Sequence, residues 1–487
     1  MNITLCIDCG LTKAKLLLLD EAGASYGKEE FSTPVSGVRI ETLSLQALLR
    51  QAVADLLAHS DIDPARIVCV TVSGHGNGLY AIGDDGALPV GYSSMFTESG
   101  AYLPERGKTF PIISQADWCG QPLPILSWIK AQHPQEYAKI RKIMFCKDLL
   151  RWFMTGSAAI EKTDASAAGL INSRTGERDL DLLRIYRLED AASMLPPIAE
   201  SDRPAGFISR RFSDATGLPE GVPVLGGLFD VNSCMLGSGV IGDSQYALIA
   251  GTWGVNAIGS ERLIESTRIT QCCRFYGEVP FVCIDSAPTS CTNLEWYVEQ
   301  VMNLISYAEA DRIVQAEPFD ERLVYLPYLF SPMDMPNAQG GFIGLQPGHN
   351  ARAMLRAVFE GIVFEHLYRL QKLQASGLIA TEAVLSGGAA NSPVFGQMFA
   401  DVCGVNVRVP AQTQAGALGG AVLSAKFRGV YPSISQAVSH IIAYKGACAP
   451  QAEQTRRYRK KFARFLELRD RLNAATVTAE QTYRLLP

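Results

Sequence analysis

Gly226-Gly227-Leu228-Phe229-Asp230, near the middle of the 487-residue chain, is the stretch around which fold and function are organised. Its two glycines permit a positive φ and a close approach of the backbone, and an aspartate follows beside apolar residues. A carboxylate in a partly dry environment can have its pKa raised until it accepts protons near neutrality. We therefore interpret Asp230 as a candidate general base, with the two halves of the chain around it. The alternative is an aspartate that only caps a turn, and this segment alone does not decide between the two.

The composition is that of a large globular protein. With 47% hydrophobic and 19% charged residues, the chain has enough apolar material for large packed cores. Its length fits about two to four domains. The net charge is −5, from 44 Lys and Arg against 49 Asp and Glu, and no basic stripe is present. This distribution argues against nucleic acid as a partner, and a small anionic ligand would have to be held by local backbone dipoles.

The sequence also predicts where the protein is located. The amino terminus runs directly into a strand-like segment, so no secretory signal is visible. No apolar run approaches the roughly 18 to 20 residues that a membrane-spanning helix needs. Twelve cysteines are scattered along the chain, which favours a reducing compartment. We expect a cytoplasmic protein with no membrane partner, and a homodimer is left open as its oligomeric state.

One pattern occurs twice along the chain. Within residues 3–19, two expected strands flank a tight turn at 10–13, and within residues 246–258 two more flank a turn at 250–254. Each turn contains small residues and a threonine. The recurrence predicts two halves of similar design, with a boundary near residue 242. The expected segments are residues 1–242, residues 243–450 and a helical tail at 451–487.

Hydrophobic spacing predicts further elements between and after these hairpins. A strand is expected at 67–72, followed by the glycine-rich loop Ser73–Gly78, and a second strand at 384–386 leads into Gly387–Asn391. We predict helices over 43–57, 124–155, 353–370 and from about 393, surface connections over 173–225, and a solvated basic helix over 452–472.

Three small-residue loops, 10–13, 251–254 and 387–391, each follow an expected strand. Consecutive backbone N–H groups in such loops form anion-binding sites, and a helix start adds the positive end of its dipole. Thr12 and Thr252 supply hydroxyl groups. Ordinary tight turning is the alternative for any single loop. Three such loops on two similar halves favour a nucleotide as the ligand.

A few other residues resemble metal ligands or parts of cofactor motifs. Asp8 ends the first strand beside the first loop, where a carboxylate can hold hydrated Mg²⁺ against phosphate, or can simply cap the hairpin. Gly237–Gly242 matches a dinucleotide fingerprint, but it leads into a strand rather than opening a helix. The six histidines lack metal-ligand spacing, and only His75 lies in a glycine-rich loop.

Together these segments resemble the FGGY carbohydrate kinases. The resemblance covers roughly residues 3–445 and rests on an ordered set of motifs: Ile7–Lys15, Ser73–Gly78, Asp230, Gly251–Gly254 and Ser386–Ala389. It implies an α/β protein with two ribonuclease-H-like (actin-like) domains and an interdomain cleft. It also implies ATP with Mg²⁺ as the phosphoryl donor and a sugar or polyol as the acceptor.

The resemblance also assigns roles to individual residues. Asp230 matches the catalytic base, and Asp8 matches the Mg²⁺-associated aspartate. The nucleotide contacts implied are Thr12, Lys15, Gly251, Thr252, Gly387, Gly388, Ala389 and Asn391. The sugar contacts implied are His75, Gly76, Asn77 and Gln121, together with Asp230 itself.

The identity of the sugar is less well defined. Gly226–Val231 and Gly251–Trp253 look most similar to the L-xylulose kinases of the family, which phosphorylate pentuloses. The family commonly has an acidic residue and an arginine just after residue 92, where this chain has Ser93–Thr97. D-xylulose, ribulose and glycerol therefore remain as other acceptors. An actin-like ATPase without sugar transfer and a sugar-binding protein without catalysis are the other two hypotheses.

Overall fold

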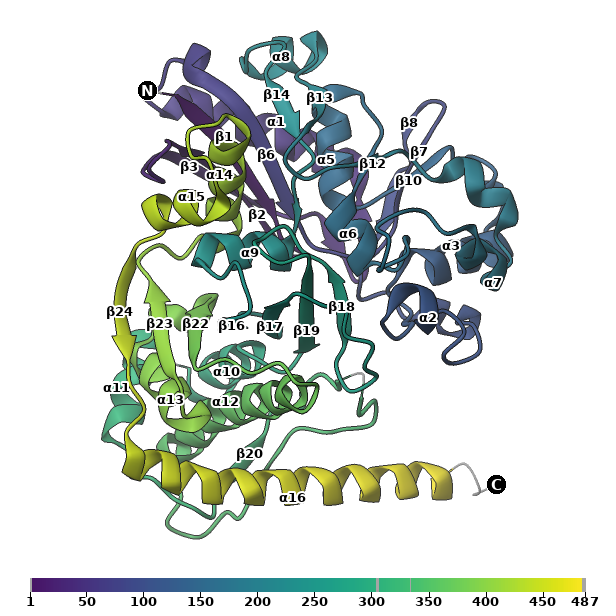
Figure 1. Cartoon of the computed structure of the whole chain (residues 1–487). Coiled ribbons are helices and arrows are strands. Elements are labelled where there is room, and N and C mark those ends of the chain that lie inside the picture. Colours follow the sequence, from purple (N-terminus) through teal and green to yellow (C-terminus); the bar gives the residue numbers. More distant parts are fainter. Residues whose placement is uncertain (1, 304–305, 333, 484–487) are drawn as a thin grey trace. The chain divides into compact units, whose positions relative to one another are not determined.

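The computed structural model describes residues 2–303, 306–332 and 334–483. The chain divides into two compact units, each built from three stretches of sequence (Figure 1). Unit 1 comprises Met1–Gly242, Gly259–Cys283 and Gln414–Ile442, and unit 2 comprises Asp243–Ile258, Ile284–Thr413 and Ala443–Pro487. The segment boundaries at 242 and 450 stay predictions.

The main sheet of unit 1 is organised around β1 (Ile3–Cys9). β1 runs antiparallel to β2 (Lys13–Leu19), as the hairpin pattern predicts, and parallel to β6 (Ile67–Gly74). The strand order is β13-β14-β6-β1-β2-β3, and the short β15 (Leu228–Phe229) pairs with the end of β6. The remaining strands are β3 (Ser25–Ser32), β13 (Pro204–Phe207) and β14 (Pro223–Leu225). The carboxyl ends of β1 and β15 therefore lie on either side of the end of β6.

Side chains of β1 alternate between two layers of helices, because successive residues of a strand point to opposite faces. The odd-numbered residues of β1 belong to a buried apolar core that also contains side chains of three helices. These helices are α1 (Thr42–His59), α5 (Cys146–Thr155) and α8 (Arg210–Thr216). The sheet is thus anchored firmly on the face opposite to Asp8.

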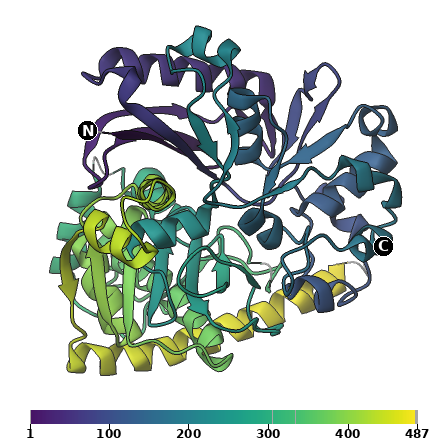
Figure 2. The same cartoon turned by 45° about the horizontal axis from the view of Figure 1, so that its top comes forward.

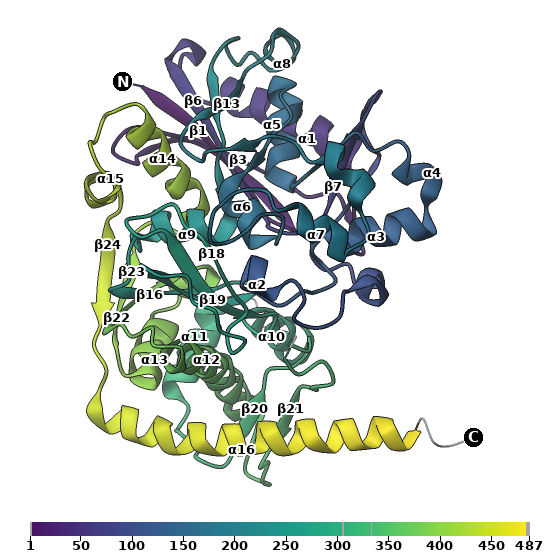
Figure 3. The same cartoon turned by 45° about the vertical axis from the view of Figure 1, so that its right-hand side comes forward.

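The other face of β1 is covered by α14 (Ala415–Phe427), which packs against α9 (Asp230–Ser238). Thr4 and Ser424 share a buried hydrogen bond of 2.7 Å between their hydroxyl oxygens. Figures 1 and 3 both show α14 beside β1. Seven of the thirteen residues of α14, AGALGGAVLSAKF, are Gly or Ala, and these small residues permit the close packing.

A second core in unit 1 is built from residues 79–195. Two three-stranded sheets lie in this part of the unit. One contains β7 (Tyr80–Gly83), β8 (Gly86–Ala87) and β10 (Lys142–Met144), and the other contains β4 (Val35–Ser36), β5 (Arg39–Glu41) and β9 (Val90–Tyr92). Of these strands, β7, β9 and β10 contribute buried side chains to the second core. Its helices are α3 (Pro122–Gln132), α4 (Pro134–Tyr137) and α7 (Leu180–Ile185). The prediction of a helical pattern throughout 124–155 is wrong at β10, because Ile143 and Met144 are buried by pairing with β7.

Residues 173–225 are not all surface connections, as the sequence suggested. β13 and β14 belong to the main sheet, and Val224 and Leu225 are fully buried. Val224 pairs with Val70 of β6. The charged, Pro-rich and Gly-rich composition of the whole stretch hid two short strands, each of only three or four residues.

The sheet of unit 2 repeats the arrangement around β1. β16 (Gln245–Ala250) runs antiparallel to β17 (Gly254–Ser260) and parallel to β22 (Glu382–Ser386). Beyond β22 lie β23 (Asn406–Pro410) and β24 (Tyr444–Cys448). The predicted recurrence of one hairpin design in two halves is therefore confirmed.

Two long helices form much of the core of unit 2. They are α12 (Ala351–Ala375) and α13 (Pro393–Cys403), and the rings of Phe359 and Phe395 stack between them at a centroid distance of 4.3 Å. The predicted helices over 353–370 and from about 393 are confirmed. Among the described residues, no helix combines the length and hydropathy that crossing a membrane requires.

The terminal helix α16 (Ala452–Tyr483), yellow in Figure 2, is one long element, and it is not simply solvated. It buries Phe462 and Phe465 against Phe364 of α12. Its Lys461 is also buried and forms an ion pair with Glu360 of the same helix α12. The predicted helix is correct in position, but the expectation of a solvated face overlooked the aromatic residues between the basic ones.

The remaining elements complete the fold. The strands are β11 (Ile160–Glu161), β12 (Ile198–Ala199), β18 (Gln271–Arg274), β19 (Phe281–Ala287), β20 (Val324–Leu326) and β21 (Gly341–Ile343), and β18 and β19 belong to the seven-stranded sheet that contains β16 and β17. The helices are α2 (Phe110–Ile113), α6 (Lys162–Ala167), α10 (Thr292–Trp296), α11 (Tyr307–Ala316) and α15 (Ile434–Ile441). Single turns are η1 (Pro64–Arg66), η2 (Glu98–Tyr102), η3 (Glu189–Met194), η4 (Tyr297–Met302) and η5 (Gly388–Asn391).

Candidate active site

Asp230 is the first residue of α9, directly after the strand β15. Gly227 has φ +83°, and a Cβ at this position would overlap the carbonyl oxygen of Val72 in β6. Only glycine fits such a backbone, so Gly227 is what allows this segment to lie against β6. The Asp230 carboxylate accepts a hydrogen bond of 2.7 Å from the Val231 amide through Oδ1.

The environment of Asp230 favours its protonated form. Burial raises the pKa of Asp230 to about 7, and the nearby Asp8 carboxylate contributes in the same direction. The backbone amides of Val231 and Gly76 oppose this rise in pKa by donating hydrogen bonds to the charged form. Part of the side chain stays accessible to solvent. A carboxyl group with this pKa exchanges protons readily near neutral pH.

Asp8 lies close to the end of β1, on the face covered by α14. Its Oδ1 accepts a hydrogen bond of 2.8 Å from Ser73, and a Cβ on Gly416 would overlap its carboxylate. Burial raises the pKa of Asp8, while the Ser73 hydroxyl and the Lys15 ammonium oppose the rise. Within the described residues, no group of three or more His, Cys, Asp or Glu side chains could hold a metal ion.

A hydrated Mg²⁺ does not require such a group, because it commonly uses one or two carboxylates together with phosphate oxygens and water. Asp8 is partly accessible and carries one remaining carboxylate oxygen beyond the Ser73 hydrogen bond. The remaining carboxylate oxygen of Asp8 is therefore a suitable ligand for a Mg²⁺ ion that is held mainly by a bound nucleotide.

The residues predicted to contact sugar lie around the end of β6. The His75 amide donates to the Cys9 carbonyl oxygen at 2.9 Å, which fixes the loop against the end of β1. A Cβ on Gly76 would overlap the ring of Phe229, so the loop also packs tightly against the segment that leads into Asp230. The structure thus brings His75 and Gly76 together with Asp8 and Asp230.

Three buried polar atoms of this region lack a hydrogen-bond partner among the described residues: His75 Nδ1, Asn77 Oδ1 and Gln121 Nε2. A hydrogen bond of 2.8 Å from the Gly78 amide to the Gly120 carbonyl oxygen joins the loops that carry Asn77 and Gln121. Buried polar groups are nearly always paired in folded proteins. Unpaired donors and acceptors at these positions fit a ligand with several hydroxyl groups.

The predicted loop at 10–13 is a tight turn of unit 1, closed by a 3.0 Å hydrogen bond from the Gly10 amide to the Lys13 carbonyl oxygen. Thr12 is exposed at its tip. Lys15 lies opposite Asp8 in the β1–β2 register and is partly buried. The first candidate phosphate loop and the candidate metal ligand therefore belong to one hairpin.

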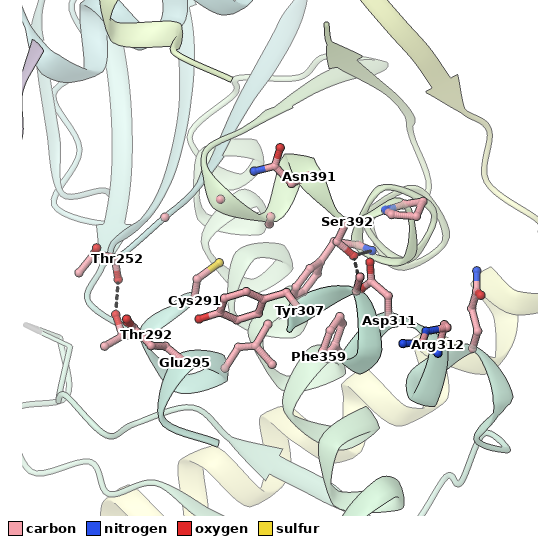
Figure 4. Close-up of a pocket in the computed structure, with 18 residues that line it drawn as sticks. Thr252, Cys291, Thr292, Glu295, Tyr307, Asp311, Arg312, Phe359, Asn391 and Ser392 are labelled. Atoms are coloured by element: carbon pink, nitrogen blue, oxygen red, sulfur yellow. Dashed lines mark hydrogen bonds between the residues drawn. The ribbon is translucent and has the colours of Figure 1, made fainter. Parts of the chain in front are cut away.

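Unit 2 contains a cavity of about 850 Å³ (Figure 4). It is lined by the predicted residues Gly251, Thr252, Gly388, Ala389 and Asn391. The loops meet there because β16 and β22 are parallel neighbours whose carboxyl ends coincide. Gly387 has φ +83°, and a Cβ on it would lie 2.6 Å from the Ala250 carbonyl oxygen. This glycine is therefore needed for the two loops to approach each other.

The other walls of this cavity could not be assigned from the sequence. Tyr307 and Phe359 provide aromatic surface, and Ser392 donates a 2.6 Å hydrogen bond to Asp311 at one side (Figure 4). On the opposite side, the Thr292 hydroxyl donates to the Thr252 carbonyl oxygen at 3.0 Å. Flat apolar surface with a few polar groups at its edge suits a planar heterocyclic ligand.

Sequence reasoning also missed a cluster of charged side chains in unit 1. Five residues on α5, β11 and α6 are fully buried and are linked by a chain of ion pairs: Lys147, Asp148, Arg151, Glu161 and Asp164. A signal was present, because Lys147, Asp148 and Arg151 interrupt the otherwise apolar run from Phe145 to Phe153. Such charges would be placed on a solvated face by default.

Comparisons with known proteins give a consistent result. The N-terminal domain of the FGGY family of carbohydrate kinases matches residues 3–237, and its C-terminal domain matches residues 289–426. The probable L-xylulose kinase of Haemophilus influenzae is 29% identical over 485 residues, covering 96% of this chain and 98% of that protein. The L-xylulose/3-keto-L-gulonate kinase of Escherichia coli is 29% identical over 479 residues, covering 95% of each.

Solved structures agree on the fold. The ligand-bound xylulose kinase from Lactobacillus acidophilus superposes with a TM-score of 0.87 at 20% identity, over 98% of this chain and all of that one. The Plasmodium falciparum glycerol kinase with ADP gives 0.85 at 16% identity, over 96% of this chain and 98% of that one. The predicted α/β fold with two ribonuclease-H-like (actin-like) domains is confirmed.

Proposed function

This chain belongs to the FGGY family of carbohydrate kinases, and from that premise we propose that it transfers the γ-phosphate of ATP to a hydroxyl group of a ketopentose such as L-xylulose. Kinases of this family use ATP, generally with Mg²⁺. In the proposed reaction, Asp230 is the general base that removes the proton from the acceptor hydroxyl group.

The observation that carries this proposal is the position of Asp230 beside unpaired polar groups. Its carboxyl group, with a pKa of about 7, lies next to the loop in which His75 Nδ1 and Asn77 Oδ1 have no hydrogen-bond partner within the described part of the chain. A sugar bound there would satisfy these atoms and present a hydroxyl group to the carboxylate. As the sugar oxygen attacks the γ-phosphorus, Asp230 accepts its proton, so that no alkoxide has to form in isolation.

For the nucleotide, we propose the cavity of unit 2 as the adenosine site. Its aromatic walls suit the base, and the amides of the Gly251–Thr252 and Gly387–Asn391 loops suit phosphate oxygens. Thr12 and Lys15 of the first hairpin are proposed as further phosphate contacts, and Asp8 as the ligand of Mg²⁺. When bound, Mg²⁺ offsets the negative charge on the transferring phosphoryl group.

The choice of a ketopentose rests on the relatives. The two proteins named above at 29% identity are both named for L-xylulose, and one also for 3-keto-L-gulonate. The segment Ser93–Thr97 differs from the common family pattern, and Ser93 is buried. We therefore propose L-xylulose as the first acceptor to examine and a kinase for a related ketose or polyol as the alternative.

A sugar panel tests the proposed function. We expect ADP release from ATP to depend on added sugar, with L-xylulose giving the highest kcat/KM among L-xylulose, D-xylulose, ribulose, 3-keto-L-gulonate and glycerol. The measurement is a coupled ADP assay with phosphorylated product confirmed by mass spectrometry. Sugar-independent ADP release would instead favour an actin-like ATPase, and sugar binding without ADP release would favour a binding protein.

The pKa of Asp230 gives a pH dependence for the same reaction. A base must be deprotonated to act, and burial raises the pKa of Asp230 to about 7. We expect kcat/KM for the sugar to level off above pH 7 to 8 and to fall about tenfold per pH unit below pH 7, because protons then occupy the base. Initial rates between pH 5.5 and 9, at saturating ATP and Mg²⁺, measure this profile. A flat profile down to pH 5.5 would contradict a base with this pKa.

A further inference from the structure

The segment Gly226–Asp230 is held at both ends by side chains that lie behind it. At its start, Arg151 Nη1 donates a hydrogen bond of 2.7 Å to the Gly226 carbonyl oxygen. At its end, the Phe229 amide donates a hydrogen bond of 3.0 Å to the Thr163 hydroxyl oxygen. Phe229 immediately precedes Asp230, so the Thr163 contact holds the Leu228–Phe229 peptide unit, one residue before the candidate base.

Thr163 is itself held in one orientation. Its hydroxyl group donates to Glu161 Oε2 at 2.8 Å, which leaves the hydroxyl oxygen to accept from the Phe229 amide. Glu161 also accepts from the Thr163 amide at 2.8 Å and from the Ser201 hydroxyl at 2.6 Å. The Thr163 side chain is 3% exposed, and Glu161 is fully buried. The Glu161 carboxylate can only accept hydrogen bonds, so the Thr163 hydroxyl group must donate to it. The Thr163 oxygen is then left to accept from the Phe229 amide.

Behind these contacts lies the buried cluster of charges. Lys147 Nζ is 3.0 Å from Asp148 Oδ1, 3.5 Å from Glu161 Oε2 and 3.3 Å from Asp164 Oδ2. Arg151 Nη1 is 2.9 Å from the same Asp148 oxygen. All five side chains are fully buried, so the group is shielded from solvent and salt.

The cluster joins two cationic side chains, Lys147 and Arg151, to three carboxyl groups. Burial raises the pKa of Asp164 well above its ordinary value, and the Lys147 ammonium opposes this rise. Burial opposes the charged form of Lys147, but the neighbouring carboxyl groups of Asp148, Asp164 and Glu161 raise its pKa overall. A buried network of this kind contributes little net stability but defines one geometry, since any partner that moves leaves an unpaired charge.

We propose that Thr163 and Arg151 are positioning residues for the reaction, which hold the Gly226–Asp230 segment so that the Asp230 carboxylate meets the acceptor hydroxyl group. This inference rests on the proposed function, because it requires Asp230 to be the base. Neither side chain is needed for contact with sugar or nucleotide. Both act through the backbone of the segment, and a displacement of about 1 Å at a reacting group can cost on the order of 10²-fold in rate.

The test is a double-mutant cycle between Thr163→Val and Asp230→Asn. Valine keeps the shape of threonine but removes the hydroxyl group, so the Phe229 amide loses its acceptor. We expect Thr163→Val to lower kcat by about 10 to 100-fold with the KM for ATP unchanged. In the Asp230→Asn background, we expect the same substitution to change kcat less than twofold, because there is no base left to position.

Three further variants make the result specific. Thr163→Ser keeps the hydroxyl group, and we expect it to restore kcat to within about threefold of the unmodified protein. Thr216→Val removes another buried hydroxyl group of unit 1, which bonds to the Phe212 carbonyl oxygen in α8, and we expect unchanged kcat. Arg151→Lys keeps the positive charge but shortens the reach to the Gly226 carbonyl oxygen. It is expected to repeat the behaviour of Thr163→Val in both backgrounds, and it provides the test if Thr163→Val does not fold.

Rates are normalised to the fraction of protein that binds ATP in calorimetry, so that unfolded protein does not lower kcat. The inference is overturned if Thr163→Val and Arg151→Lys keep normal kcat, if they lower kcat equally in both backgrounds, or if Thr163→Ser is as slow as Thr163→Val. Failure of the proposed function is seen separately, because Asp230→Asn alone would then retain near-normal turnover.

Discussion

Asp230→Asn is expected to lower kcat by roughly 10² to 10⁴-fold, the range over which general-base catalysis contributes. Asparagine has the size of aspartate and still accepts the 2.7 Å hydrogen bond from the Val231 amide, so α9 should start at the same place. It cannot accept the proton of the acceptor hydroxyl group. We therefore expect ATP affinity, measured by calorimetry, to be retained, and the loss to appear in single-turnover rates of product formation.

A matched control is Asp181→Asn, which also removes a carboxylate from the first turn of a helix in unit 1. Asp181 is exposed and pairs with Arg184 at the surface, where an ion pair contributes little. Unchanged kcat is expected for this control. Near-normal turnover of Asp230→Asn would eliminate Asp230 as the base, whatever the behaviour of the other residues.

Gly237→Ala is expected to destabilise unit 1 by about 3 kcal/mol or more, the upper end of what overpacking costs. A Cβ at Gly237 of α9 would overlap the Ala415 carbonyl oxygen of α14 and lie 2.6 Å from the Gly419 nitrogen. These are backbone atoms, so no side chain can rotate away, and the two helices would have to separate. Because α9 begins with Asp230, the same separation would disturb the candidate base.

The measurement is the urea midpoint followed by far-UV circular dichroism, compared with Gly100→Ala. Gly100 lies in the short turn η2 of unit 1, where a Cβ would meet nothing within 4 Å, and its φ is not positive. We expect this control to unfold within about 0.5 kcal/mol of the unmodified protein. A normal midpoint for Gly237→Ala would show that α9 and α14 are packed less closely than described.

Local patterns predicted much of the fold. The hairpins around residues 10–13 and 250–254 were expected from alternating apolar runs and small-residue turns, and both are present with antiparallel register. Each hairpin is followed, later in the chain, by the parallel strand that was expected to end in a glycine-rich loop. These features depend on residues that are neighbours in the sequence, and so they can be predicted from the sequence alone.

Elements that depend on distant partners were missed or misread. β10 is only three residues long and is stabilised by pairing with β7, which lies about 60 residues earlier in the sequence. The sequence predicted a surface connection where β14 lies, but β14 pairs with β6 and is buried by that pairing. The α16 side chains Phe462 and Lys461 face α12 rather than solvent. In each case burial comes from tertiary contact, which overrides local composition.

For the candidate site, too, some features could be predicted from the sequence and others became clear only from the structure. Reading the residue types in the loops after the strands was enough to predict the candidates Asp8, Thr12, Asp230 and Thr252. The tertiary structure alone decided that Asp8 and Asp230 interact, because β1 and β15 both pair with β6. It alone revealed that Arg151 and Thr163 hold the backbone of the base segment. The residue types in a loop show which functional groups are present there. The pKa shifts and the orientations of those groups arise from burial and from partners distant in sequence.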